Sequence, residues 1–173
     1  MKNNLALTGM MGVGKSTVGK ALSKRLLMDF SDIDKIIEKK LEMTIQKIFE
    51  KRGETFFREL EEKTTLKELK KKNIIISLGG GSFINPIIRK NILLNCECFW
   101  LDLDLALLEK RLHKSKKRPL LDGKNLRKNL ETIYNKRSKT YAAADYKINC
   151  NKLNIKLITN KIIKLHANNK ALS

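Results

Sequence analysis

The sequence predicts an α/β fold in which helices cover both faces of a parallel β-sheet. Short apolar runs of strand length alternate along the chain with amphipathic segments of helix length. This alternation favours parallel strands, because a parallel pair needs a long crossover connection, usually a helix. Ligands of such sheets bind beyond the carboxyl ends of the strands, so the loops that follow the apolar runs are the places to examine for function.

The predicted elements follow one another in a regular order. The first apolar run, 5–8, leads into a glycine-rich loop and a helix over 15–27. A short strand at 28–33 precedes helices over 35–41, 45–51 and 55–71. The isoleucine-rich run at 74–78 has the composition of a buried strand and ends in three glycines. Two more strands are predicted at 98–102 and 146–150, with helices over 105–113, 125–143 and 155–166.

Length and composition indicate a single domain over 1–173. The chain is 42% hydrophobic, which is ordinary for a chain of this size with one core. It contains no run of the roughly 20 apolar residues that a membrane span needs. Its first residues lack the pattern of a signal peptide, so we expect a cytoplasmic protein without membrane contact. The spacing of Cys96, Cys98 and Cys150 is not that of a disulfide framework or a zinc site.

The net charge of +19 makes nucleic-acid binding an alternative to consider, because excess Lys and Arg neutralise phosphates. The 37 basic residues are scattered along the chain, and aromatic residues, at 6%, do not interleave with them as a base-stacking surface requires. We expect most of this charge to be solvated surface that speeds encounter with anionic substrates. No nucleic-acid partner is expected; a salt-sensitive shift of labelled DNA or RNA would favour the alternative.

The loop at 9–16 is a complete G-x-x-x-x-G-K-S pattern, the phosphate-binding P-loop. Its glycines let the backbone turn successive N–H groups toward an anion, at the positive end of the following helix. Lys15 is placed to contact the β- and γ-phosphates, and the Ser16 hydroxyl to bind Mg²⁺. The predicted nucleotide site comprises Gly12, Val13, Gly14, Lys15, Ser16 and Thr17.

A P-loop usually works with a carboxylate near the metal ion. Two pairs share an i, i+2 spacing that would direct both side chains to one face of a strand: Asp32 with Asp34, and Asp102 with Asp104. Helix N-capping explains the later pair more simply. The early pair precedes a segment rich in anion-binding residues, and we favour it. One carboxylate would orient water around Mg²⁺ while the other accepts the proton of the attacking hydroxyl.

Three later segments indicate an acidic acceptor. Arg58 follows two aromatic residues, and its planar guanidinium suits bidentate capture of a carboxylate. The simpler alternative is a surface ion pair with Glu61 or Glu62 on the same helix. The glycines at 79–81 allow close approach of backbone to a ligand, or form a flexible turn. The basic loop at 116–121 suggests a lid that brings Arg118 onto the transferring phosphate.

Taken together, these motifs resemble the shikimate kinase family, from Gly9 to about Asp145. They are GMMGVGKST at 9–17, Asp32-x-Asp34, Ile48-Phe49, GETFFRELE at 53–61, SLGGG at 77–81, RPLL at 118–121 and Arg137-x-x-x-Tyr141-x-x-x-Asp145. The resemblance implies a five-stranded parallel sheet, a substrate-binding segment over about 31–62 and a mobile lid over about 112–124. It also implies transfer of the γ-phosphate of ATP to the 3-hydroxyl of shikimate, in aromatic amino-acid biosynthesis.

The resemblance also implies an acceptor site. Asp34 would polarise the 3-hydroxyl, and Arg58 and Arg137 would hold the shikimate carboxylate. The full set would be Asp34, Phe49, Phe57, Arg58, Gly79, Gly80, Gly81 and Arg137, with the Gly80 backbone against the ring and the two phenylalanines as walls.

On the nucleotide side, the resemblance implies that Arg118 touches ATP from the lid and that Arg111 lies against the adenine. Asp32 would support the Mg²⁺ that Ser16 binds. The resemblance also implies a monomer, and the expected partners are ATP and shikimate. The loop at 149–154 carries no clear family signature, and no residue there is assigned.

A related kinase of gluconate or of a nucleoside monophosphate is the alternative within enzymes, since it would also need ATP and a basic lid. Asp34, Arg58, the triple glycine and Arg137 together argue against it, because each has a place around a ring with a carboxylate and hydroxyls.

Overall fold

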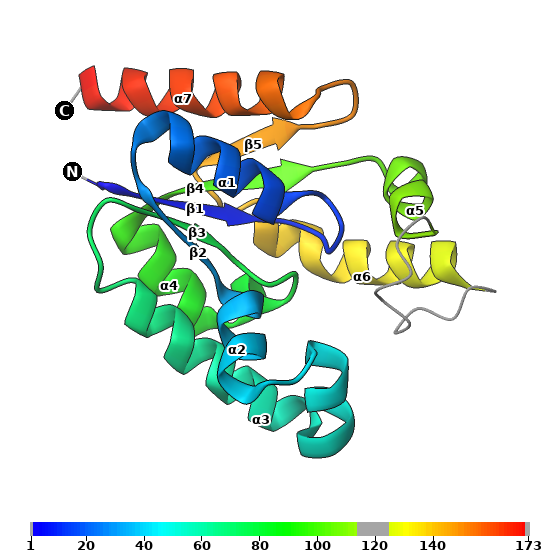
Figure 1. The fold of residues 1–173 in the computed structure, drawn as a ribbon. Coiled ribbons are helices and arrows are strands. Elements are labelled where there is room, and N and C mark those ends of the chain that lie inside the picture. Colours follow the sequence, from blue (N-terminus) through cyan, green and yellow to red (C-terminus); the bar gives the residue numbers. More distant parts are fainter. Residues whose placement is uncertain (1, 114–124, 172–173) are drawn as a thin grey trace.

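A five-stranded, all-parallel sheet forms the centre of the molecule, with strand order β2-β3-β1-β4-β5 (Figure 1). The computed structural model describes residues 2–113 and 125–171. The strands are β1 (Asn4–Thr8), β2 (Asp29–Asp32), β3 (Ile74–Ser77), β4 (Cys96–Asp102) and β5 (Tyr146–Asn149). The described helices are α1 (Lys15–Leu26), α2 (Ile33–Leu41), α3 (Ile45–Glu68), the 3₁₀ turn η1 (Ser82–Ile84), α4 (Pro86–Asn95), α5 (Leu105–His113), α6 (Leu126–Tyr141) and α7 (Ile155–Ala171).

Helices cover both faces of the sheet and make three layers, as the sequence predicts. Helices α1 and α7 pack side by side on one face, where Arg25 of α1 donates to the Thr159 hydroxyl of α7 at 3.0 Å. Helices α3, α4 and α6 lie on the opposite side (Figure 1). Strands β1 and β3 are buried along their whole length, because helices cover both faces of the central strands.

The predicted strands are confirmed, with bounds that shift by one or two residues. Gly53 has φ 79° inside α3, and this kink accounts for the two helices expected over 45–51 and 55–71. Helix α4 is missing from the sequence prediction. Its signals were present, since the Asn85 side chain accepts from the Ile87 and Ile88 N–H groups as an N-cap and Pro86 occupies the first turn.

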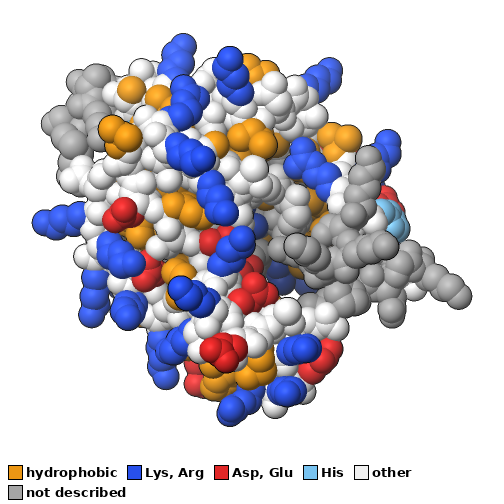
Figure 2. Space-filling view, in the orientation of Figure 1, with side chains coloured by type: hydrophobic (Ala, Val, Ile, Leu, Met, Phe, Trp, Pro, Cys, Tyr) orange, Lys and Arg blue, Asp and Glu red, His pale blue; other side chains and the backbone are white. Residues whose placement is uncertain are grey.

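The lid predicted over 112–124 lies almost wholly outside the described residues, and Arg118 lies outside them too. Within the described ranges, no helix has both the length and the apolarity needed to cross a bilayer. Figure 2 shows Lys and Arg side chains over much of the face drawn, with Asp and Glu side chains among them in its lower half.

Candidate active site

The P-loop follows β1 at the carboxyl edge of the sheet and ends in the first turn of α1. Gly9 has φ 133°, and a Cβ there would collide with the backbone oxygen of Leu101, so no larger residue fits between the loop and β4. Gly14 caps α1 with φ 107°, a conformation that L side chains rarely adopt. The loop is further tied to α5, because Arg111 donates to the Val13 carbonyl at 3.0 Å. Backbone geometry therefore fixes the shape of this loop.

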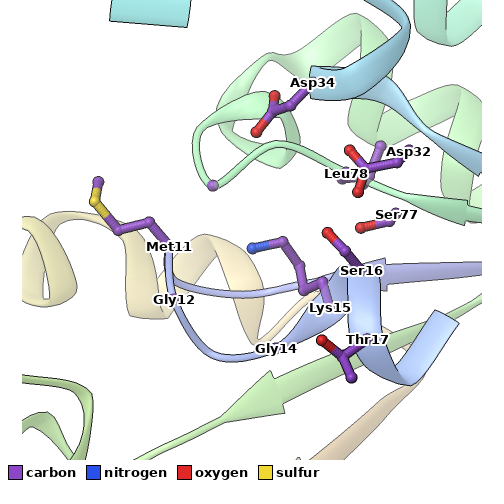
Figure 3. A pocket seen from close by; sticks show the side chains of 11 residues that line it. Met11, Gly12, Gly14, Lys15, Ser16, Thr17, Asp32, Asp34, Ser77 and Leu78 are labelled. Atoms are coloured by element: carbon purple, nitrogen blue, oxygen red, sulfur yellow. The ribbon is translucent and has the colours of Figure 1, made fainter. Parts of the chain in front are cut away.

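The pocket at this edge is lined by Met11, Gly12, Gly14, Lys15, Ser16, Thr17, Asp32, Asp34, Ser77, Leu78 and Gly80. In Figure 3 the P-loop residues Lys15 and Ser16 face Asp32 and Asp34 across the pocket. The Lys15 ammonium is buried and donates to the carbonyls of Gly9 and Met10 at 2.8 and 2.9 Å. A cation, a hydroxyl and two carboxylates thus meet in one pocket.

The two early aspartates reach this pocket from different elements. Asp32 ends β2 and caps α2, accepting from the Lys35 N–H at 3.2 Å, whereas Asp34 lies in the first turn of α2. The expectation that both lie on one face of a strand is therefore wrong, because the helix begins directly after Asp32. The Asp32 Oδ2 atom is buried without a hydrogen-bond partner among the described residues. Such an atom is unsatisfied unless a ligand reaches it.

The later aspartates do not line this pocket. Asp104 Oδ1 accepts from the Ala106 N–H at 2.8 Å, which is the N-cap role that the sequence suggests. Asp102 does not cap the helix. Its carboxylate pairs with Lys147 at 3.0 Å and accepts from the Tyr134 hydroxyl at 3.2 Å. The structure thus gives this second pair separate structural contacts.

The triple glycine connects the pocket to α3. A Cβ on Gly79 would lie 2.6 Å from Asp34 Oδ1 and 2.6 Å from Glu61 Oε1, so any side chain there would collide with two carboxylates. Gly80 lies against the P-loop, where an added Cβ would be 3.2 Å from the Met11 nitrogen. A Cβ on Gly81 would be 2.9 Å from both terminal nitrogens of Arg58. A side chain at 79 or 81 would force these neighbours to shift, so glycine favours this close approach.

Arg58 sits between an aromatic pair and two carboxylates. The ring centroids of Phe49 and Phe57 lie 4.8 Å apart. The Cζ atom of Arg58 lies 5.9 Å from the first centroid and 5.2 Å from the second. It also pairs with Glu61 at 2.8 Å and with Glu54 at 3.0 Å. Burial alone would lower the pKa of Arg58, but Glu61 and Glu54 reverse this effect and raise it. The guanidinium is thus paired with two carboxylates beside the pocket, with about a third of its side chain exposed.

Glu61 is more than a surface partner of Arg58. The ion pair exists, but the Glu61 side chain is 1% exposed and accepts a second hydrogen bond from the Ser82 hydroxyl. The i, i+3 spacing predicts the pair, whereas burial under the loop that follows β3 is a tertiary effect.

Arg137 approaches the triple glycine from α6. Its Nη1 donates to the Gly80 carbonyl at 3.0 Å, and the Tyr141 hydroxyl donates to the same oxygen. Asp145, the third member of that motif, lies elsewhere, since it accepts from the Cys98 N–H at 2.8 Å and pairs with Lys2 at 3.1 Å. Its contacts are structural.

A second depression lies beside the P-loop and is lined by Leu107, Lys110, Arg111 and Asn151. Arg111 also contacts the P-loop through the Val13 carbonyl, and its role against adenine stays a prediction. Asn151, from the loop that lacked a clear signature, accepts from the Asp104 N–H at 2.7 Å.

Comparisons with known proteins agree with this geometry. A family model described as "Shikimate kinase" matches residues 11–167. The shikimate kinase of Bartonella henselae is 38% identical over 160 residues, which cover 92% of this chain and 76% of that protein. The shikimate kinase of a Sulfurihydrogenibium species is also 38% identical over 160 residues, with coverage of 92% and 95%. The solved shikimate kinase from Acinetobacter baumannii, in complex with shikimate, superposes with a TM-score of 0.92 at 32% identity, covering 97% of this chain and 94% of that one.

Proposed function

The chain belongs to the shikimate kinase family, and we propose that it transfers the γ-phosphate of ATP to the 3-hydroxyl of shikimate with Asp34 facing that hydroxyl. The observation that carries this proposal is one pocket lined both by the P-loop and by Asp34. A P-loop alone binds a nucleotide. The carboxylate across the pocket supplies a base for an alcohol acceptor.

We place the carboxylate of the acceptor next to this pocket. Arg58 lies against Gly81 and Arg137 against Gly80, so two guanidinium groups border the loop at 79–81. A guanidinium group can donate two parallel hydrogen bonds to the two oxygens of a carboxylate. The rings of Phe49 and Phe57 offer an apolar wall beside Arg58. Shikimate carries a carboxylate, a ring and hydroxyls, and each feature has a partner here.

In the transfer step, the shikimate oxygen attacks the γ-phosphorus and its proton passes to Asp34. The new oxygen–phosphorus bond forms as the bond to the β-phosphate oxygen breaks, and ADP leaves. Lys15 offsets charge on the β- and γ-phosphates, together with the backbone N–H groups of the P-loop. We assign the same role, offsetting charge on the transferring phosphate, to Arg118, which lies outside the described residues.

We assign the Mg²⁺ of ATP to Ser16 and Asp32. Both residues line the pocket, and the unsatisfied, buried Oδ2 of Asp32 fits a site that a hydrated cation reaches. When bound, the ion supplies positive charge against the triphosphate. Removal of the metal with EDTA should abolish turnover, and added Mg²⁺ should restore it.

We also propose that the protein acts as a monomer in the cytoplasm, with ATP and shikimate as its substrates. The scatter of Lys and Arg along the chain, without interleaved aromatic residues, is consistent with solvated charge rather than a nucleic-acid surface. Sedimentation at working concentration, with and without labelled RNA at physiological salt, tests both the oligomeric state and nucleic-acid binding.

The test of the function is ADP release, measured by a coupled assay with ATP and Mg²⁺. Shikimate, gluconate, several nucleoside monophosphates and no acceptor are compared side by side. Turnover that depends on shikimate is expected. Turnover with another acceptor, or slow hydrolysis alone, would retain the nucleotide site and overturn the roles given to Arg58, Gly80 and Arg137.

A further inference from the structure

Tyr141 lies behind the acceptor half of the site, at the last residue of α6, and its side chain is fully buried. Its hydroxyl donates to the Gly80 carbonyl, the oxygen that Arg137 also contacts. Gly80 and Arg137 are both assigned to shikimate in the proposed function, whereas Tyr141 has no role there. The Tyr141 hydroxyl therefore bonds directly to Gly80, a residue that the proposed function assigns to shikimate.

The bond from Tyr141 fixes more than one atom. A peptide unit is planar and trans, so the direction of the Gly80 carbonyl also fixes the following Gly81 N–H on the opposite side. Gly81 is the residue that approaches the Arg58 guanidinium. Orientation of this one peptide therefore affects the contact with Arg58, on the acceptor side of the pocket.

The hydroxyl is also kept in its donor form. Burial raises the pKa of Tyr141, and this effect outweighs the opposing influence of the Arg137 and Arg58 charges. The ring packs at 5.9 Å from Trp100, the single tryptophan of the chain. Emission of Trp100 therefore reports whether the ring of residue 141 keeps its packing.

We infer that Tyr141 is a positioning residue of the acceptor site, orienting the peptide between Gly80 and Gly81 and, through the shared carbonyl, Arg137. This inference rests on the proposed function. Because the nucleotide site does not depend on this carbonyl, loss of the hydroxyl should affect shikimate and spare ATP.

The experiment compares Tyr141→Phe with Tyr134→Phe, a matched control on the same helix. The Tyr134 hydroxyl bonds to Asp102, outside the pocket. Tyr141→Phe should raise the KM for shikimate about tenfold, the size expected for one buried hydrogen bond, with a matching change in Kd by calorimetry. The KM for ATP should stay within about twofold, and Tyr134→Phe should leave both constants within about twofold. Unchanged Trp100 emission checks the packing.

Tyr141→His, whose ring retains a donor, is the second variant. Its KM for shikimate should lie between those of the wild type and Tyr141→Phe. If the phenylalanine variant does not fold, Tyr141→His is compared with the wild type in its place. A wild type that turns over shikimate beside folded variants with an unchanged KM would overturn this inference alone. Equal rises in both KM values would overturn it too. A wild type without shikimate turnover would overturn the proposed function and the inference together.

Discussion

The phosphate-binding part of the proposed site comes from one contiguous stretch, 9–17, whereas the acceptor half that we propose draws on residues from α2, α3, the loop after β3 and α6. In the first half, backbone conformation at Gly9 and Gly14 determines the shape. In the second half, charged side chains hold one another, as in the contact of Arg58 with Glu61 and of Glu61 with Ser82. The nucleotide half should therefore tolerate distant side-chain changes that disable the acceptor half.

The largest expected effect separates chemistry from nucleotide binding. Asp34→Asn removes the proposed base, so kcat should fall about a hundredfold or more, while ATP binding by calorimetry stays within about twofold. Asp29→Asn is the control, since Asp29 lies exposed at the start of the neighbouring strand β2. Near-normal turnover of Asp34→Asn would show that Asp34 is not the base.

A somewhat smaller effect is expected at Arg58. Arg58→Ala should raise the KM for shikimate about tenfold to a hundredfold, because a charge-assisted hydrogen bond contributes about 1.5–3 kcal/mol, and the KM for ATP should change little. Arg52→Ala, on the same helix and over Phe56 at 5.5 Å, is the control.

Arg58→Ala also leaves Glu61 as a buried charge without that partner, which lowers stability. The double variant Arg58→Ala/Glu61→Gln should recover stability in urea unfolding without recovering shikimate affinity. Recovery of both would mean that the single variant acted through folding alone.

Gly81→Ala should have a milder effect of the same kind. The added methyl group would lie 2.9 Å from the Arg58 guanidinium, so the side chain must move. An increase of about threefold to tenfold in the KM for shikimate is expected, in line with the cost of overpacking. In an Arg58→Ala background, Gly81→Ala should cause no further rise in the KM for shikimate. An undiminished rise there would show that Gly81→Ala does not act through Arg58.

The smallest effect is expected at Glu68, the last residue of α3, which accepts a hydrogen bond from Ser31 of β2. Burial alone would raise the pKa of Glu68, but hydrogen bonds from Lys71 and Ser31 outweigh burial and lower it. A lowered folded pKa stabilises the fold above the unfolded value of about 4.3, and this contribution is lost as pH falls through the folded pKa. Glu68→Gln should therefore cost about 1 kcal/mol of unfolding free energy at pH 7 and progressively less below pH 4. A cost that does not change with pH would contradict this assignment.

Much of the fold is predictable because its signals are local. The apolar run at 74–78 and the P-loop at 9–16 each carry their structure within a few residues. Helix α4 was predictable from the Asn85-Pro86 start, and its omission reflects a missed cap signal. The place of Asp34 was harder to predict, since i, i+2 spacing cannot show that β2 ends at Asp32 and a helix begins at once.

The acceptor half was predictable only in part, for a physical reason. Motif spacing pointed to Arg58 and Gly80, but spacing along the chain does not reveal which side chains become buried together. The burial of Glu61 between Arg58 and Ser82 is created by the approach of α3 to the loop after β3. The shared contact of Arg137 and Tyr141 with Gly80 likewise joins residues 57 and 61 positions apart.

The division of the site is tested most directly by calorimetric binding of ATP with Mg²⁺, and separately of shikimate, to Lys15→Ala and Arg58→Ala. We predict a crossed pattern, in which Lys15→Ala loses ATP and retains shikimate while Arg58→Ala loses shikimate and retains ATP. Folded variants that each lose both ligands to the same extent would contradict the account.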